Sequence, residues 1–158
     1  MTDQDLLWDY GGEILHSQGM DLERQIPQHG RVNCFDHSVA VALLSLRLAR
    51  WLGLRVDRRS LIRGALLHDY FLYDWHTLHP RPGLRHGLSH GLRHGGRAAA
   101  NADRDFGLNA VEADIIRRHM FPLTLTPPRY RESLLVCWAD KVCAVREFGG
   151  GLWRTRAK

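Results

Sequence analysis

The sequence predicts a single all-α domain of about six or seven helices. Apolar residues recur at helical spacing in several long segments, most clearly over residues 35–52 and 128–148. No stretch alternates apolar and polar residues with a period of two over five or more residues, and the turn chemistry of β-hairpins is absent. A chain of 158 residues is long enough to build one domain with a substantial core. We therefore expect no sheet larger than a stray hairpin.

The composition is that of an ordinary globular protein, with 25% charged and 44% hydrophobic residues. The three cysteines, Cys34, Cys137 and Cys143, show no CxxC spacing, which argues against a disulfide framework and for a reducing compartment. The first residues are acidic and lack the apolar region of a signal peptide. No apolar run approaches the roughly 18 residues needed to cross a bilayer. We expect a soluble, cytoplasmic protein with no membrane partner.

The net charge of +5 is compatible with nucleic acid or with small anionic molecules as partners. The arginines are scattered through every segment, however, and no strip of basic and aromatic residues or groove-reading helix can be identified. The sequence therefore argues against nucleic acid. The only basic cluster without nearby acidic residues, 154–158, follows three glycines. We expect residues 1–148 to form the domain and residues 149–158 to form a flexible basic tail.

The first third of the chain predicts two helices joined by an irregular segment. Residues 3–18 have an acidic start and helical apolar spacing, which predicts a helix that docks on the domain. Residues 19–34 contain glycine, proline and asparagine and predict an irregular connection, in which Gln28, His29 and Gly30 form either a polar turn or part of a site. Residues 35–52 predict a strong helix that ends at Gly53. In that helix, one inward face carries His37, Val41, Leu44 and Leu48.

A second buried helix ends in a histidine and an aspartate. Asp57 is a good N-cap for a helix over residues 58–68, and its apolar run stops at His68 and Asp69. Burying both side chains without partners would cost several kcal/mol. The simplest alternative is a helix that has reached solvent at this point.

Residues 70–96 predict an irregular connection, because glycine is frequent there and disfavours a long helix. Ten histidines are the anomaly of the composition, and seven lie between His68 and His119. Within the connection His86, His90 and His94 recur every four residues, either as part of a site or by chance. We expect helix to begin near His94 and to continue through the alanine-rich residues 95–106.

The last part of the chain predicts two more helices. Asn109 and Glu112 form the start of a capping box for a helix to about His119, which shares a face with two isoleucines. Pro128 suits the first turn of a final helix to about residue 148. That helix is apolar around most of its circumference, which predicts a central position. Asp140 lies in its middle, where aspartate is a poor helix former and has no capping role. The ordinary explanation for a buried aspartate at this position is an ion pair with an arginine.

Five polar residues thus look inward from five different predicted helices, and Asp69 adjoins one of them. Taken singly, each has an ordinary explanation, such as a hydrogen-bonded core histidine or an ion pair. Metal ligation explains all of them at once, because histidine and carboxylate on converging helices can surround a divalent ion. Six protein ligands are too many for one catalytic metal with an open position, and they suit two metals bridged by Asp69. The predicted ligands are His37, His68, Asp69, His94, His119 and Asp140.

This ordered set resembles the binuclear pattern of the HD-domain superfamily of metal-dependent phosphohydrolases. The resemblance covers about residues 28–146, and residues 65–75 are similar to small bacterial HD proteins of unassigned substrate. It implies that one metal is held by His37, His68, Asp69 and Asp140. It also implies that the second is held by Asp69, His94 and His119, which are the expected catalytic residues. The two divalent ions would be manganese, iron, nickel, zinc or magnesium.

The activity that the resemblance implies is hydrolysis of a phosphomonoester or phosphodiester by a metal-bridging hydroxide. Nucleotide-like compounds belong to this substrate class, and we expect a small phosphorylated partner. Many binuclear cyclic-nucleotide phosphodiesterases of this superfamily carry a lysine shortly after the histidine-aspartate pair. Residues 70–73 contain no lysine and no glycine-tyrosine-proline signature follows, so the resemblance does not support a cyclic dinucleotide as substrate. The alternative function is a non-catalytic, metal-binding regulatory domain.

Candidate phosphate-binding cations are Arg118, Arg129, Arg131 and Lys141, and Arg118 has the alternative of an ion pair with Asp114 four residues earlier. His90 and Asp74 are candidates for orienting ligands or protonating the leaving group, or are ordinary loop residues.

Overall fold

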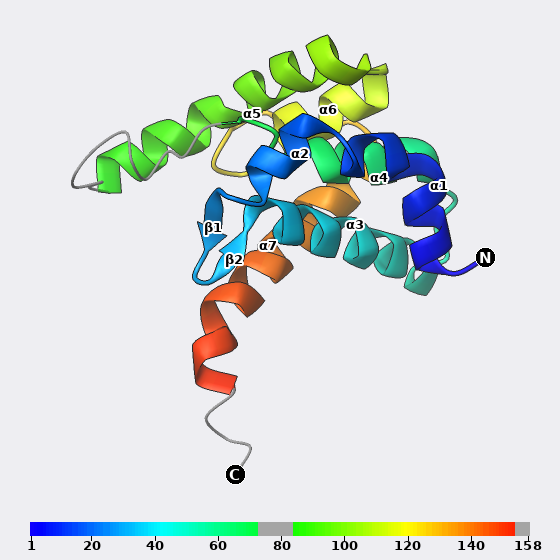
Figure 1. Ribbon diagram of the computed structural model, residues 1–158, viewed down its shortest axis with the longest axis horizontal. Helices are drawn as coiled ribbons and strands as arrows, with labels where there is room; N and C mark the ends of the chain where they lie inside the picture. Colours follow the sequence, from blue (N-terminus) through cyan, green and yellow to red (C-terminus); the bar gives the residue numbers. More distant parts are fainter. Residues whose placement is uncertain (73–83, 154–158) are drawn as a thin grey trace.

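The computed structural model describes residues 1–72 and 84–153, with side chains for residues 1–72 and 95–149. These ranges form seven helices and one short hairpin, so the predicted all-α class is confirmed (Figure 1). The helices are α1 (Asp3–Leu15), α2 (Gln18–Glu23), α3 (Cys34–Trp51), α4 (Arg58–Leu67), α5 (Leu84–Phe106), α6 (Ala110–Arg118) and α7 (Arg131–Trp153). The hairpin pairs β1 (Pro27–His29) with β2 (Val32–Asn33).

Helix α4 is the centre of the domain. It packs against α1, α3, α6 and α7, and every residue from Ser60 to Leu67 is buried. Helix α1 docks on α4 and α3, as expected for the N-terminal segment, and Arg50 on α3 binds Asp3 at 2.8 Å. Gly64 lets α4 approach α6 closely, because an added Cβ would lie 2.4 Å from Ile115 Cδ1. The residues that directly follow the buried end of α4, His68 and Asp69, therefore lie in the interior.

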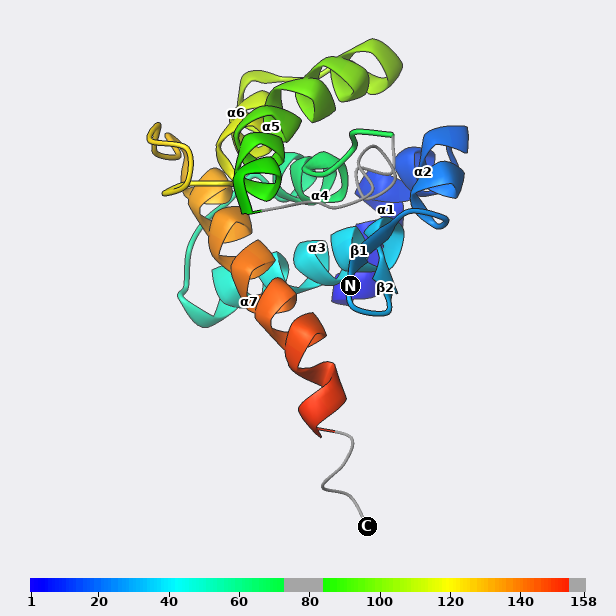
Figure 2. The same cartoon turned by 90° about the vertical axis from the view of Figure 1, so that its left-hand side faces the viewer.

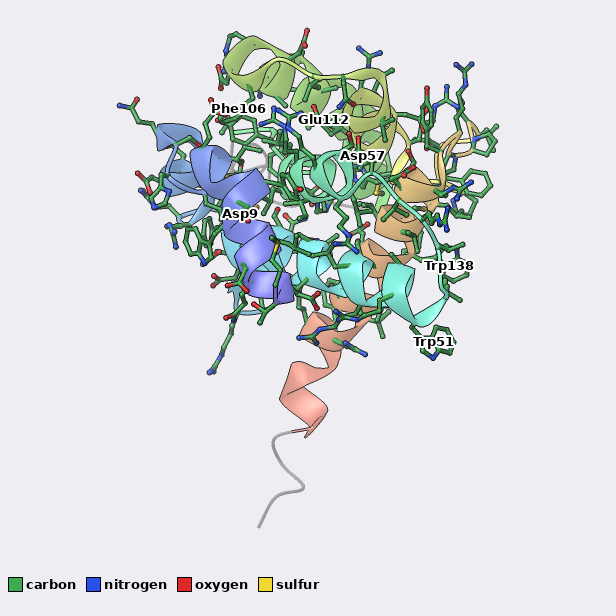
Figure 3. All side chains as sticks on the ribbon, turned by 90° about the vertical axis from the view of Figure 1, so that its right-hand side faces the viewer. Asp9, Trp51, Asp57, Phe106, Glu112 and Trp138 are labelled. Atoms are coloured by element: carbon green, nitrogen blue, oxygen red, sulfur yellow. The ribbon has the colours of Figure 1, made fainter. Side chains whose placement is uncertain are left out.

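The prediction that the last helix is central is wrong. Helix α7 covers α3 and α6 with one face, and its C-terminal part extends beyond the rest of the domain (Figures 1 and 2). Trp138 on this helix and Trp51 at the end of α3 project from the surface (Figure 3). An apolar composition all round a helix does not distinguish a central helix from one that exposes apolar residues. The outer face of α7 leaves 48–72% of each of four residues exposed, namely Leu134, Trp138, Val145 and Phe148.

Helix ends follow the local signals in the sequence. The Asp57 side chain accepts a hydrogen bond from the Ser60 N–H at 3.2 Å and caps α4. Asn109 and Glu112 form the predicted capping box of α6, with backbone-to-side-chain distances of 2.9 and 3.1 Å. Gly53 follows α3 with a φ of +64°, a conformation that glycine adopts without strain.

Three segments differ from the sequence-based expectations. The connection over residues 19–34 contains most of α2 and the hairpin, whose turn uses Gly30 at a φ of +59°. Helix α5 begins at Leu84 rather than near residue 94. The four-residue recurrence of His86, His90 and His94 is close to the helical period, and each glycine in a helix costs only about 1 kcal/mol relative to alanine. Helix α7 begins at Arg131 rather than at Pro128 and continues to Trp153. Residues 149–153, expected in the tail, are therefore helical, and residues 154–158 lie outside the described ranges.

A buried ion pair joins α4 to the corner between α5 and α6. Arg63 Nε donates to Glu112 Oε1 at 2.8 Å, and the two side chains are 3% and 1% exposed. Arg63 Nη2 donates to the carbonyl oxygens of Phe106 and Gly107 at 3.1 and 3.2 Å. Phe106 and Glu112 mark this corner in Figure 3. The guanidinium therefore holds the end of α5 and the start of α6 against the central helix.

Within residues 1–72 and 84–153, no helix combines the length and the apolar character that crossing a membrane requires.

Candidate metal centre

Five of the six predicted ligands meet where α3, α4, α6 and α7 converge. His37 lies in the first turn of α3, and Asp140 lies in the middle of α7. His68 and Asp69 directly follow α4, and His119 directly follows α6. All five are buried, with exposed fractions between 0% and 8%. His94 belongs to α5, but its side chain lies outside those that the structure describes.

Asp69 faces all three imidazole rings. Its Oδ2 atom lies 3.4 Å from His68 Nε2 and 4.0 Å from His37 Nε2, and its Oδ1 atom lies 3.4 Å from His119 Nε2. Asp140 Oδ1 lies 3.0 Å from His37 Nε2 and 3.6 Å from His68 Nε2. These atoms form two overlapping groups, each with its ligand atoms within 4.8 Å of one another. One contains His37, His68 and Asp140, and the other contains His68, Asp69 and His119.

His68 and His119 are oriented by the same local device. Each caps the C-terminal end of its helix and donates from Nδ1 to the carbonyl oxygen three residues earlier, at 2.7 Å to Ala65 and 2.8 Å to Ile116. The last carbonyl groups of a helix have no partner within the helix, so they are available to such a side chain. Because a carbonyl oxygen only accepts, Nδ1 must carry the proton, and Nε2 faces the carboxylates. This is the arrangement that fixes a histidine for metal binding.

Helix α5 approaches this centre through Gly95. A Cβ added at Gly95 would lie 3.0 Å from the carbonyl oxygen of Ile116 and 3.4 Å from that of Arg117. The backbone of α5 therefore rests on the last turn of α6, just before His119. The predicted role of His94 beside His119 stays a prediction.

The charges of the centre favour a cation. Burial opposes protonation of His37, but hydrogen bonds to Asp140 and Glu147 outweigh it and raise its pKa to about 9. Burial also opposes protonation of His68, but the neighbouring Asp69 and Asp140 raise its pKa above the ordinary value. Burial opposes ionisation of Asp140, but the hydrogen bond with His37 and the charge of the nearby His68 ring lower its pKa well below the usual range. The buried carboxylates thus favour the protonated, positively charged form of these imidazoles. A bound metal ion would supply the positive charge in place of those protons.

The donor set fits a divalent first-row metal. His68 Nε2 is buried and forms no hydrogen bond of ordinary geometry with the described residues, although two carboxylates face it. Imidazole nitrogen and carboxylate oxygen are the ligands that such metals accept readily. A metal would satisfy this nitrogen and both aspartates together.

Three of the four candidate phosphate-binding cations have structural partners. Arg118 pairs with Asp114 at 2.9 Å, the alternative that the sequence left open, and donates to the Pro127 carbonyl oxygen at 2.8 Å. Lys141 Nζ donates to the His119 carbonyl oxygen at 2.9 Å. Arg131 donates to the Arg55 carbonyl oxygen at 3.0 Å. The fourth candidate, Arg129, has an exposed side chain and a backbone N–H that donates to Asp114.

Sequence reasoning missed two contacts to the centre. The Gln28 amide nitrogen donates to Asp69 Oδ2, and its amide oxygen accepts a hydrogen bond from the Cys34 thiol at 3.1 Å. The sequence allows the turn that contains Gln28 to be part of a site, but nothing in its local pattern points to Asp69. Glu147 contacts His37, and its one signal in the sequence is its spacing of seven residues from Asp140.

A buried carboxyl group near the centre makes stability depend on pH. Glu23 is 2% exposed and accepts a hydrogen bond from the Leu72 N–H at 3.2 Å, and burial raises its pKa from 4.5 to about 7. The folded pKa exceeds the unfolded one, so the stabilisation is complete below about pH 4.5 and is lost as the pH rises through about 7. The loss is on the order of 3 kcal/mol.

Glu23→Gln should remove this dependence. In the metal-free protein, urea unfolding should show the variant gaining stability relative to wild type between about pH 4.5 and about pH 8, by roughly 3 kcal/mol. Comparing the two proteins at each pH cancels the contribution of the histidines to the unfolding free energy, because the histidines titrate in both proteins. An equal difference in unfolding free energy at both pH values would contradict the raised pKa.

Comparison with known proteins adds one finding. The family model described as HD domain matches residues 34–145, which is well over half of the chain and includes all six predicted ligands. No curated protein and no solved structure matches the chain.

Proposed function

The chain belongs to the HD domain family, whose superfamily consists largely of metal-dependent hydrolases, and on that premise we propose that it hydrolyses a phosphate ester. The observation that carries the proposal is the position of Asp69, whose two carboxylate oxygens face imidazoles from three segments. His37, His68, Asp69 and Asp140 would hold one ion. Asp69, His94 and His119 would hold the second.

The residues of this chain prepare the site for hydrolysis. When bound, two such ions lower the pKa of water and neutralise charge on phosphoryl oxygens. Asp69 Oδ2 faces His37 and His68, and Oδ1 faces His119, so this one carboxylate could contact both ions. The backbone hydrogen bonds of His68 and His119 keep Nε2 directed at Asp69. Their burial limits competing contacts with bulk water.

The proposed substrate is a small phosphomonoester or phosphodiester, and nucleotides belong to this class. Tyr70 and Phe71 directly follow the aspartate and are each 2% exposed, and the Tyr70 hydroxyl donates to Asp105 at 3.1 Å. Many cyclic-nucleotide phosphodiesterases of the superfamily carry a lysine in this region, whereas Tyr70 and Phe71 are buried in the core here. This supports a substrate other than a cyclic dinucleotide.

A metal-dependence assay tests the function directly. Metal-stripped protein is reconstituted with manganese, iron, nickel or zinc and assayed against phosphomonoesters, phosphodiesters and nucleotides. We expect hydrolysis that requires metal and that His119→Ala abolishes, whereas His16→Ala, at the exposed C-cap of α1, leaves it unchanged. Metal bound tightly without hydrolysis of any substrate class would favour the non-catalytic regulatory domain.

A further inference from the structure

We infer that Glu147 is a positioning residue for the metal centre, holding the His37 ring so that Nε2 faces Asp140 and the bound ion. The inference rests on the proposed metal binding. Glu147 lies beyond the range that the HD domain model matches, residues 34–145.

Both ring nitrogens of His37 are engaged, although the residue is fully buried. Nδ1 lies 2.8 Å from Glu147 Oε2 and 3.0 Å from Glu147 Oε1. Nε2 lies 3.0 Å from Asp140 Oδ1. An ionised carboxylate only accepts hydrogen bonds, so the bond to Glu147 keeps a proton on Nδ1. A neutral ring in this state presents its lone pair at Nε2, on the side of Asp140 and Asp69.

His37 needs a side-chain partner because of its place in the fold. His68 and His119 use carbonyl oxygens at helix C-termini, where these groups have no intrahelical partner. His37 lies in the first turn of α3, where the carbonyl groups already accept intrahelical hydrogen bonds. A carboxylate from another helix supplies the missing acceptor.

The spacing on α7 delivers that carboxylate. Asp140 and Glu147 are seven residues apart, so at 3.6 residues per turn they lie on nearly the same face, two turns from each other. That face presents one carboxylate to each nitrogen of His37. The hairpin lies beside this turn of α7, since a Cβ added at Gly30 would be 3.4 Å from the Glu147 carbonyl oxygen (Figure 1). The Glu147 side chain is only 11% exposed.

A different use of the same residues is a separate ion site. His29, His37 and Glu147 place one ligand atom each within 4.8 Å of one another. A neutral imidazole has one lone pair, however, so a ring that ligates through Nε2 carries a proton on Nδ1 and has no second ligand atom. An orienting role for Glu147 is therefore the one compatible with His37 in the metal centre.

The test compares Glu147→Ala and Glu147→Gln with Glu132→Gln. Glu132 is a matched control, because it is a 7%-exposed carboxylate on the same helix and accepts a hydrogen bond from the Asp57 N–H, away from the centre. Zn²⁺ affinity is measured by competition with a chelator, with folding checked by circular dichroism. We expect about 10–100-fold weaker binding for Glu147→Ala. Glu147→Gln should lose less, because its amide oxygen still accepts the hydrogen bond, and Glu132→Gln should match wild type.

The tautomer of His37 separates positioning from general destabilisation. In ¹⁵N-detected spectra of the zinc-loaded protein, wild type should show a protected Nδ1–H on His37, and Glu147→Ala should lose that protection. Unchanged Zn²⁺ affinity and an unchanged Nδ1–H signal in Glu147→Ala would overturn the inference and leave the proposed function standing. Loss of one whole ion with the remaining affinity intact would overturn it in favour of the separate site. Failure of wild type itself to bind Zn²⁺ would overturn the inference and the proposed function together.

Discussion

Asp69→Asn is expected to empty both proposed metal positions and to lower hydrolysis by more than about 100-fold. Asparagine keeps the size of aspartate but removes the charge that faces His37, His68 and His119. Losing a residue that only orients a ligand typically costs about 10–100-fold, and a carboxylate shared by two ions should cost more. Elemental analysis of the purified variant, together with the metal-dependence assay, measures both effects.

Asp114→Asn is the matched control for this change. Asp114 is also a buried aspartate, 8% exposed, but it binds Arg118 and the Arg129 N–H rather than the metal centre. We expect it to lose stability and to retain metal. An Asp69→Asn protein that keeps two ions and wild-type activity would show that Asp69 is not the bridging ligand.

Arg63→Ala should lower the free energy of unfolding by about 3 kcal/mol. The change leaves the buried Glu112 carboxylate without its closest cation, and breaking such a pair typically costs about 3–5 kcal/mol. It also removes a donor from the carbonyl oxygens of Phe106 and Gly107. The Asn109 N–H still donates to Glu112, which places the expected loss at the lower end of that range.

Arg59→Ala provides the comparison. Arg59 lies 3.6 Å from the same carboxylate oxygen but is 55% exposed, so its loss should cost less than about 1 kcal/mol. Both variants are compared with wild type by urea denaturation. A loss below about 1 kcal/mol for Arg63→Ala would mean that the ion pair does not hold the α5–α6 corner against α4.

The features that could be predicted from the sequence are those with local causes. The caps at Asp57 and Asn109 and the stop at Gly53 each depend on one or two side chains within a few residues. The convergence of His37, Asp140 and the end of α4 was also predictable. Each residue shares an apolar helical face, and apolar faces of helices meet in the core.

The features that the sequence did not reveal depend on distant partners. The glycine-rich start of α5 is helical against its local propensity, which is a weak constraint. The apolar outer face of α7 looks the same in sequence as a buried one. Gln28 reaches Asp69 across 41 positions, and Glu147 reaches His37 across 110, so neither contact has a local signature.

Anomalous diffraction from crystals of the manganese-loaded protein tests the central claim most directly. The claim predicts two peaks at the manganese edge, roughly 3.5–4 Å apart, with Asp69 between them. His37 and Asp140 should contact one peak, and His94 and His119 the other. His119→Ala should remove the second peak and leave the first, and His37→Ala should do the opposite. A single peak in wild type, with His94 and His119 more than about 3.5 Å from it, would contradict the two-metal account, because a metal–nitrogen bond measures roughly 2.0–2.1 Å.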